Sequence, residues 1–261
     1  LLSAASAELR DLDHVLQQVQ ADEQVEMRNT TEERGVIVLA GPRARDVLRS
    51  LTDASLESAE FPWRSAQEID IAGVATLALR INYVGELGWE LHPAMADLPS
   101  LYAAIWAAGE AHGIADFGLY ALNSLRMEKA YRGWGAELTN EVTMLEADMA
   151  RFFGSSKEDF VGKTATEAGE AGPLRLVYFE VDAEDADVRG GEPIFLNDTC
   201  IGVTTSGGYG YTVEKSLGFG YVPSAQSAPG SIIDVGLLDA RCRATVLAEP
   251  IYDPANERLA S

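Results

Sequence analysis

The chain has 261 residues, 47% of them hydrophobic and 23% charged, which predicts a soluble globular protein and excludes a disordered or collagen-like chain. Its 41 Asp and Glu against 20 Lys and Arg give a formal charge of -21, and such a field repels phosphodiester backbones, so no nucleic-acid partner is expected. The apolar runs fall short of the ~20 residues that cross a bilayer, so no membrane segment is expected either.

The cysteines and histidines give no sign of a metal site. Cys200 and Cys242 stand far apart without CxxC or Cys/His spacing, which argues against a disulfide framework, a zinc site and a thiol nucleophile. His14, His92 and His112 are equally scattered. We therefore expect two reduced thiols and no metal, as in a cytoplasmic enzyme, or in an enzyme of the mitochondrial matrix if the source is eukaryotic.

The chain opens with LLSAASAELRDLDHVL, which lacks a start methionine and the basic flank and long apolar core of a signal peptide. Such an opening is expected of a processed or partial sequence whose first domain is incomplete at its N-terminus. From Ser6 to Val19 apolar residues recur at helical spacing, which predicts an amphipathic helix that carries Asp11 and Asp13.

Strands and helices then alternate as far as residue 131. The run VIVLA predicts a buried strand, and a Gly-Pro pair ends it and opens a helix. After a turn near residue 72, the runs ATLALRINY and GWELHP, joined by a turn at Gly85, predict a hairpin. Pro99 and Gly113 delimit one helix, and Gly133 stops another. The expected elements are a strand over 36–40, a helix over 43–51, a hairpin over 75–93, and helices over 99–112 and 117–131.

From about residue 173 the chain consists of short β-rich runs separated by Gly, Asp and Pro turns. These runs predict a small all-β sandwich or barrel. The Gly- and Glu-rich segment TATEAGEAGP, over residues 164–173, is the expected boundary. The sequence therefore predicts an α+β region over residues 1–168 and a C-terminal β domain over residues 169–261.

Four segments carry a family resemblance when they are read in order: RINYVGELGWEL, FGLYALNSLRMEKAYRGWG, TSGGYGYTVEKSLGFGYV and ATVLAEPIYDP. Together they resemble the glycine-cleavage aminomethyltransferase (T-protein) family. Within it, RMEKAYRGWGAELTNEVTMLEADM and the terminal YDP look most like the folate-binding half of dimethylglycine and sarcosine dehydrogenases. The resemblance implies three parts arranged around a tetrahydrofolate site, of which the chain lacks the opening stretch. No GxGxxG follows a strand near the start, so no flavin site is expected in this chain.

The activity that the resemblance implies is one-carbon transfer to tetrahydrofolate. An N-methylated amine or an aminomethyl carrier would supply the carbon, and methylenetetrahydrofolate would form, with a flavin-dependent domain or subunit as an expected partner. One alternative is direct methyl transfer, as in demethylases of this fold. Another is a non-catalytic folate-binding or assembly subunit. Iron-sulfur assembly relatives carry Lys-Gly-Cys-Tyr, whereas this chain has DFVGKTA and no cysteine before Cys200, which argues against that assembly role.

Asp11 is the candidate catalytic residue. It lies in SAASAELRD, which resembles the family segment whose aspartate sits beside the reactive folate nitrogens. A carboxylate there would stabilise the positive charge that develops during transfer. The family often has asparagines where this chain has Ala4 and Ala7, and an ordinary solvated helix carboxylate is the alternative interpretation.

Tyr83, Gly85 and Glu90 are candidate folate-binding residues in YVGELGWE, which resembles the family's Tyr-Thr-Gly-Glu turn and the acid that follows it. The pterin edge presents an amino group beside a ring nitrogen, and a carboxylate such as that of Glu90 would bind both through paired hydrogen bonds. Without the other motifs, the segment would be interpreted as a hairpin with a surface glutamate.

Arg126 and Trp134 are further candidate cofactor-binding residues. Glycine-cleavage enzymes carry an arginine four residues before Arg126, where this chain has Leu122, and Asn123 replaces the usual acid. Arg126 is therefore either a ligand residue or a structural arginine paired with Glu128 or a neighbouring domain. Trp134 fits either a core position or the wall of a cavity.

Tyr209 and Arg241 complete the candidate cofactor-binding set. Tyr209 is expected in a TSGGYG turn whose glycines allow close backbone approach. Arg241 and Arg243 precede the last strand, and one of them would bridge to the folate site. Alternating arginines on a strand are equally typical of a solvated face.

Overall fold

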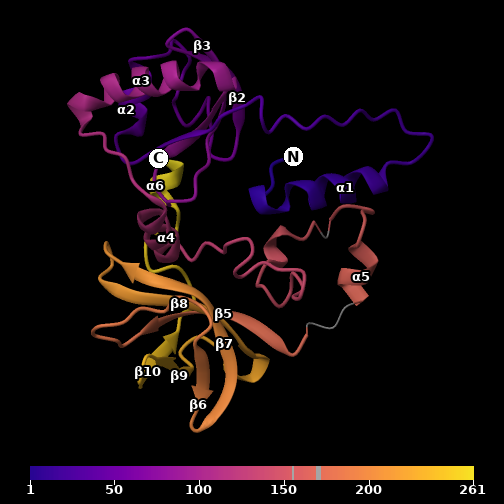
Figure 1. Ribbon diagram of the computed structural model, residues 1–261, viewed down its shortest axis with the longest axis vertical. Helices are drawn as coiled ribbons and strands as arrows, with labels where there is room; N and C mark the ends of the chain where they lie inside the picture. The colour runs from indigo at the N-terminus through magenta and orange to yellow at the C-terminus, as the bar shows by residue number, and fades with distance from the viewer. Residues whose placement is uncertain (155, 169–171) are drawn as a thin grey trace. The chain divides into compact units, whose positions relative to one another are not determined.

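The computed structural model describes residues 1–154, 156–168 and 172–261 (Figure 1). The described chain divides into two compact units. The first consists of Leu1–Asn82, Glu86–Ala115 and Leu259–Ser261, and the second of Tyr83–Gly85 and Asp116–Arg258. In the expected boundary segment over 164–173, residues 169–171 lie outside the described residues.

The first unit is built on an antiparallel sheet with the strand order β1-β4-β3-β2. Its strands are β1 (Ile37–Ala40), β2 (Ala66–Ile71), β3 (Val74–Leu79) and β4 (Gly88–Pro93). One face packs against α2 (Ala44–Arg49) and α3 (Leu98–Gly109) around the fully buried Trp89. The predicted strand–helix unit and hairpin are confirmed.

β2 was not predicted as a strand. Its sequence AQEIDI carries three polar side chains, which are of low or indifferent β propensity. The structure explains this composition, because β2 is an edge strand whose outer face is exposed at Glu68 and Asp70.

The helices before and after the sheet also follow the prediction. The N-terminal helix comprises η1 (Ala5–Ala7) and α1 (Glu8–Gln18), and none of the described residues of α1 is buried. After η2 (Met95–Asp97), α3 has a proline in its first turn and continues into η3 (Glu110–His112). Gly113 then adopts φ +74°, the left-handed conformation expected of a helix C-cap.

The last residues of the chain belong to the first unit. Leu259, in α6 (Glu257–Ala260), is 2% exposed. The guanidinium of the buried Arg80 donates to the Leu259 carbonyl at 3.3 Å, and Arg45 Nη2 donates to the Ser261 carbonyl at 2.6 Å. These contacts fasten the end of the chain to the sheet unit.

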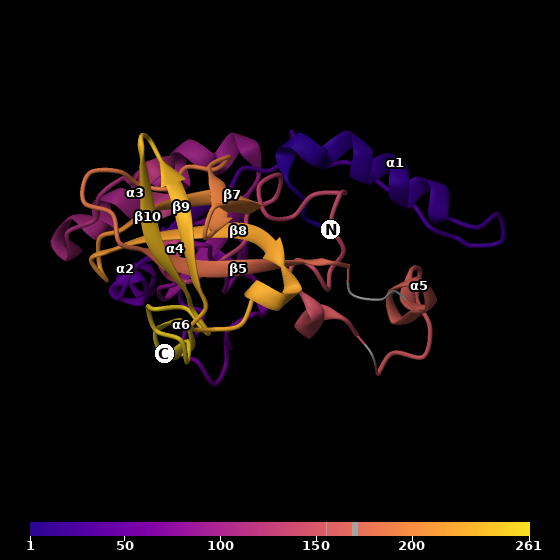
Figure 2. The same ribbon diagram turned by 90° about the horizontal axis from the view of Figure 1, so that it is seen from below.

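Within the described residues of the second unit, antiparallel strands close into a barrel with the order β10-β5-β8-β7-β6-β9 (Figure 2). This closure confirms the barrel rather than the sandwich alternative, and it pairs both edges of every strand. Val177, Phe179 and Val235 lie in its core. The strands are β5 (Leu174–Val181), β6 (Pro193–Leu196), β7 (Thr199–Gly210), β8 (Lys215–Pro223), β9 (Ile232–Leu237) and β10 (Ala240–Val246).

The predicted TSGGYG turn is wrong, because these residues continue β7 and the turn follows at 211–214. The glycines of β7 serve close packing instead. A Cβ on Gly207 would lie 2.4 Å from Val188, and one on Gly210 would lie 2.8 Å from Glu128 Cγ. The pairing of β7 with β8 shifts register between Thr204 and Ser206, where the TSGGYG run begins.

The segment between sheet and barrel contains α4 (Leu119–Glu128), which is shorter than the predicted helix over 117–131. Ala130 adopts φ +51° just beyond its end, which stops the helix before Gly133. The other short helices are η4 (Ala150–Phe152), α5 (Lys163–Ala168) and η5 (Ser224–Gln226).

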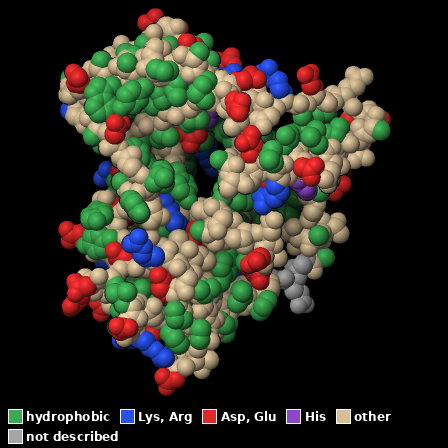
Figure 3. Space-filling view, viewed as in Figure 1, with side chains coloured by type: hydrophobic (Ala, Val, Ile, Leu, Met, Phe, Trp, Pro, Cys, Tyr) green, Lys and Arg blue, Asp and Glu red, His purple; other side chains and the backbone are tan. Residues whose placement is uncertain are grey.

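Charged side chains are spread over the surface. Figure 3 shows carboxylates scattered across the face in view, with Lys and Arg among them. The part of the chain that the structure describes contains no group of three or more side chains that could hold a metal ion. No helix in that part has the length and apolar character needed to cross a bilayer.

Candidate functional site

Polar side chains of α4 bind the backbone at the end of β7 and in the turn that follows it. Asn123 Nδ2 donates to the Gly207 carbonyl at 2.9 Å, and Ser124 Oγ donates to the Tyr209 carbonyl. One helical turn later, the Glu128 carboxylate accepts the Thr212 N–H at 2.6 Å. Residues three or four apart share a helix face, so the motif LNSLRMEK places its polar groups on the barrel.

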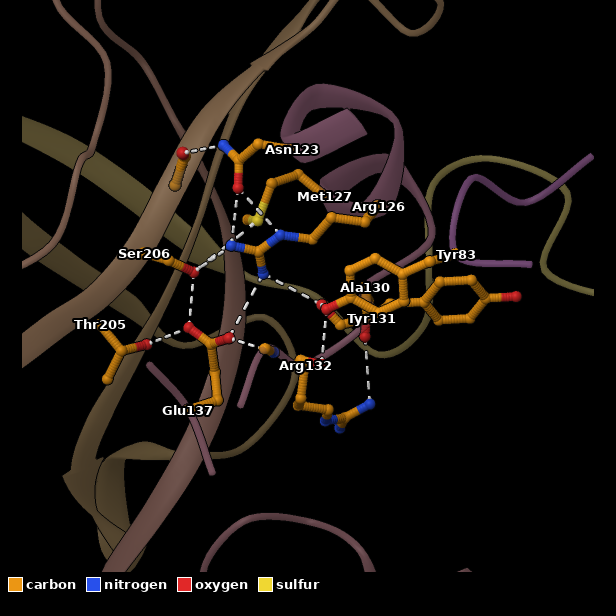
Figure 4. A network of polar contacts seen from close by, with 12 residues as sticks. Tyr83, Asn123, Arg126, Met127, Ala130, Tyr131, Arg132, Glu137, Thr205 and Ser206 are labelled. Carbon is orange, nitrogen blue, oxygen red and sulfur yellow. Dashed lines mark hydrogen bonds and ion pairs between the residues drawn. The ribbon is translucent and has the colours of Figure 1, made fainter. Parts of the chain in front are cut away.

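Arg126 and Glu137 form a buried ion pair at the centre of these contacts (Figure 4). Arg126 Nη1 lies 3.3 Å from Glu137 Oε2, and their side chains are 6% and 0% exposed. Glu137 Oε1 also accepts from Thr205 Oγ1 at 2.6 Å and from Ser206 Oγ at 2.5 Å. A charged pair is tolerated in the interior when its remaining donors and acceptors are satisfied, as they are here.

All three guanidinium nitrogens of Arg126 have protein partners. Nε and Nη2 donate to Asn123 Oδ1 at 3.0 and 2.8 Å, Nη2 donates to Ser206 Oγ at 2.8 Å, and Nη1 donates to the Tyr131 carbonyl at 3.0 Å. These are the contacts of a structural arginine. Its ion-pair partner is Glu137 and not Glu128, one of the two structural alternatives, because side chains two apart on a helix do not face each other. Its bond to Ser206 fits the other alternative, a contact with the barrel domain.

Tyr83 and Tyr131 stack with ring centroids 5.7 Å apart and an interplanar angle of 24°. Tyr83 Oη donates to the Arg132 carbonyl at 2.6 Å. Burial raises the pKa of both phenols above the usual range, since the charged phenolate would be poorly solvated there. The neutral Tyr83 phenol therefore acts as a hydrogen-bond donor that fixes the start of the loop after α4.

Gly85 allows close packing on the stem of Lys129. It adopts φ +80°, and a Cβ there would lie 2.2 Å from Lys129 Cγ. Lys129 Nζ donates to the Asp253 carbonyl at 2.6 Å and to Asn256 Oδ1 at 2.9 Å. The YVG, RMEK and YDP motifs thus meet around this buried lysine.

Trp134 is 68% exposed, so its core interpretation is wrong and the cavity-wall interpretation stays a prediction. It lies in a tight loop in which Gly135 has φ +82°. The loop is closed by hydrogen bonds from Gly135 N to the Leu138 carbonyl at 3.0 Å and from Leu138 N to the Gly133 carbonyl at 3.1 Å. Its indole is therefore displayed on an ordered loop.

Glu90 lies on β4, an inner strand of the sheet in the first unit. Because side chains alternate along a strand, it points away from the core residues Trp89 and Leu91. Val38 and Leu79 are its direct cross-strand neighbours, and its side chain is 24% exposed. His92 Nε2 approaches the carboxylate at 3.4 Å, outside hydrogen-bond geometry. Glu90 is thus a half-buried carboxylate between two apolar side chains.

Asp11 lies on α1, also in the first unit. Arg10 donates to its carboxylate at 2.8 and 3.0 Å, and this hydrogen bond holds the pKa of Asp11 below its usual range. Its side chain is 35% exposed. Asp11 is therefore an ionised and accessible carboxylate at neutral pH.

The candidate residues of the barrel differ in their surroundings. The Tyr209 ring makes an edge contact with Tyr211 at 5.1 Å, and its carbonyl binds Ser124. Arg241 is exposed, stacks over Phe195 at 4.0 Å and donates to the Asn197 carbonyl at 2.6 Å. These contacts fit the solvated-face interpretation, and the structure does not bring Arg241 to the Arg126–Glu137 network.

Sequence reasoning missed Glu137, Thr205, Ser206 and Lys129. Glu137 lies in the RMEKAYRGWGAELTNEVTMLEADM stretch that carries the resemblance. Its position as an acid shortly after a glycine-rich turn was the only local sign of a functional role. The partners of Glu137 on β7 are 68 and 69 positions away, so no local spacing reveals them.

The described chain thus consists of a helix-and-sheet unit and of a second unit in which polar side chains of α4 bind a closed barrel. Two family models match the chain: the GCVT N-terminal domain over residues 1–157 and the glycine cleavage T-protein C-terminal barrel domain over residues 175–253. The chain belongs to the glycine-cleavage T-protein family.

Known relatives extend this assignment. Human mitochondrial dimethylglycine dehydrogenase is 39% identical over 265 residues, which covers 99% of this chain and 31% of that protein. Aminomethyltransferase from Listeria welshimeri is 34% identical over 258 residues, which covers 98% of this chain and 69% of that protein. The family is thus one of enzymes, and the chain spans about a third of the length of the dehydrogenase.

A solved structure confirms the fold. The crystal structure of glycine cleavage system aminomethyltransferase T from Bartonella henselae matches with a TM-score of 0.82 at 24% identity. The match covers 96% of this chain and 67% of that one. The predicted fold class, an α+β aminomethyltransferase-like fold with a C-terminal barrel, is therefore correct.

Proposed function

We propose that the chain binds tetrahydrofolate and promotes the transfer of a one-carbon unit to it, forming methylenetetrahydrofolate. The observation that carries this proposal is Glu90, a carboxylate held on an inner strand between Val38 and Leu79. Apolar side chains would contact the faces of a flat heterocycle, and the carboxylate would bind its amino and ring N–H groups as a pair. Tyr83, Gly85 and Trp134 are the further residues proposed to contact folate.

Asp11 is the proposed helper in the transfer step. Its ionised carboxylate would stabilise the positive charge that develops as the carbon passes to a folate nitrogen. The folate nitrogen is itself the nucleophile, so binding and orientation would provide the larger part of catalysis. Arg126 is assigned a structural role in this scheme, and Arg241 has no contact that supports a role in binding.

The donor is proposed from the names of the relatives. Dimethylglycine and sarcosine dehydrogenases act on N-methylated amines, which favours a donor of that class oxidised by a flavin-dependent partner domain or subunit. An aminomethyl carrier is the alternative donor, in keeping with the aminomethyltransferase from Listeria welshimeri. The mitochondrial dehydrogenases favour the matrix if the source is eukaryotic.

Tetrahydrofolate should raise the melting temperature of the protein. A ligand that binds only the native state stabilises it by about 2.7 kcal/mol at 100 times its Kd. The measurement is a thermal melt at increasing tetrahydrofolate, with a pterin-free p-aminobenzoylglutamate control that should have little effect. A flat response to tetrahydrofolate well above micromolar concentrations would contradict folate binding.

Glu90→Gln should weaken folate binding while the fold is retained. The change is nearly isosteric but removes a charge-assisted pair, and hydrogen bonds to charged groups contribute about 1.5–3 kcal/mol. This corresponds to a rise in Kd of about tenfold or more. Glu68→Gln, an exposed change on the edge strand of the same sheet, is the control for titration by fluorescence or calorimetry. Equal affinities in both variants and the parent would make Glu90 a structural residue.

A further inference from the structure

The loop over residues 131–138, which carries Trp134, is fastened to the protein at successive positions. The Tyr131 carbonyl accepts from Arg126 Nη1 at 3.0 Å, and the Arg132 carbonyl accepts from Tyr83 Oη at 2.6 Å. Gly133 N then donates to Glu137 Oε2 at 2.7 Å. Backbone groups of three consecutive residues, in two adjacent peptide units, are thus held by side chains before the exposed indole is reached.

Glu137 joins these contacts to the barrel. Its fully buried carboxylate accepts from Gly133 and Arg126 on one oxygen and from Thr205 and Ser206 of β7 on the other. Its own carbonyl accepts from Tyr221 Oη of β8 at 2.8 Å. One residue therefore ties the two ends of the loop to each other and to two barrel strands.

The contacts that hold the loop bear on the conformation of Trp134. A tryptophan in the sequence Gly-Trp-Gly would sample many conformations if its loop were loose, because glycine restricts the backbone little. Its indole is 68% exposed and so is available to a ligand, and a fixed aromatic surface binds a flat ring with less ordering cost. The orientation of this indole therefore depends on the hydrogen bonds that hold the loop.

We propose that Glu137 is a positioning residue for folate recognition, which acts by holding the Trp134 loop against β7 and does not itself touch the ligand. The assignment rests on the proposed folate function. It gives a functional reason for a fully buried carboxylate beside a glycine-rich surface turn, where burial of a charge is otherwise costly.

The chain offers a matched control in Glu192. This carboxylate accepts from the Arg189 and Gly190 N–H groups at 3.0 and 2.9 Å, and from the hydroxyl of Thr204, also on β7. It therefore makes the same kind of contact between a glycine-bearing turn and the same strand. Its turn, however, carries no indole, so Glu192→Gln removes a comparable charge without affecting the Trp134 loop.

Hydrogen–deuterium exchange tests the structural step. In Glu137→Gln, amide exchange over residues 133–138 should accelerate about tenfold or more, the factor expected for losing one charge-assisted hydrogen bond. Glu192→Gln should accelerate exchange around residues 189–192 and leave 133–138 unchanged. If Glu137→Gln does not fold, Thr205→Val, which removes one donor to Oε1, should give a smaller effect over the same residues. Unchanged exchange over 133–138 would overturn the proposal.

A double-mutant cycle tests the functional step. Glu137→Gln should raise the Kd for tetrahydrofolate about tenfold in the parent, but change it little in a Trp134→Ala background, because the lost effect acts through the indole. Equal losses in both backgrounds, or equal losses from Glu192→Gln, would overturn the positioning role. If the parent itself fails to bind tetrahydrofolate, the proposed function is wrong, whereas the exchange data separately decide whether Glu137 fixes the loop.

Discussion

Replacing Arg126 by methionine should lower the free energy of unfolding by about 3–5 kcal/mol, the usual cost of removing one partner of a buried ion pair. The remaining Glu137 carboxylate would be fully buried and would lose its positive partner. Ser206, Asn123 and the Tyr131 carbonyl would each lose a hydrogen bond to the guanidinium as well. Chemical denaturation followed by circular dichroism measures the loss.

Arg241→Met is the matched control for this large effect. Arg241 also makes an ion pair, with Asp198 at 3.3 Å, but the two side chains are 43% and 102% exposed. Exposed pairs contribute about 0–1 kcal/mol, so the control should be nearly as stable as the parent. Similar stabilities for Arg126→Met and Arg241→Met would show that the buried pair does not hold α4 to the barrel.

Asp11→Asn should reduce the rate of one-carbon transfer about 100-fold or more, the usual contribution of general acid–base or electrostatic assistance. Shape and neutral hydrogen bonding are preserved, so folate affinity and the helix should be nearly unchanged. Because Arg10 lowers the pKa of Asp11, the parent carboxylate is charged throughout the neutral range, and the variant removes that charge. Single-turnover transfer to bound folate, in the intact enzyme or with the proposed flavin-dependent partner, is the measurement.

Asp13→Asn is the control on the same helix. Asp13 accepts from Gln17 at 2.7 Å, a local contact between neighbouring turns. Removing its charge should leave the transfer rate within about a factor of two, since Asp13 is exposed, has no proposed role in transfer, and makes a helix contact of a kind that contributes only ~0.2–0.5 kcal/mol to stability. Equal rates for Asp11→Asn, Asp13→Asn and the parent would remove Asp11 from the mechanism and favour the non-catalytic folate-binding alternative.

Sequence patterns identified the elements whose signals are local. Pro99 and Gly113 delimited a helix correctly, and the continuous run LRLVYFEV coincides with β5. The errors occurred where tertiary packing overrides local preference. β2 is polar because it is an edge strand, and the glycines of β7 allow Val188 and Glu128 to approach rather than making a turn.

In the candidate site, too, local motifs could be predicted from the sequence and tertiary contacts could not. Motif order indicated Tyr83, Gly85 and Glu90 as candidate folate-binding residues, but it did not predict what each side chain contacts. As a structural arginine, Arg126 was expected to pair with Glu128 or with a neighbouring domain. Its ion-pair partner is Glu137, 11 residues away, and it also donates to Ser206 of the barrel. Hydrogen-bond partners separated by a loop or by a whole strand of the barrel are set by the fold, and a single sequence does not contain that information.

The chain passes between the two compact units at four places, since the first unit comprises three stretches and the second comprises two. Neither unit is encoded by one contiguous stretch, so neither is a module that gene fusion or recombination can transplant by a single exchange. A segment taken up to Ala115 would omit Leu259 and the Leu259 and Ser261 carbonyls that accept from Arg80 Nη2. We therefore expect the whole region to be inherited together, without separation of the sheet unit from the barrel.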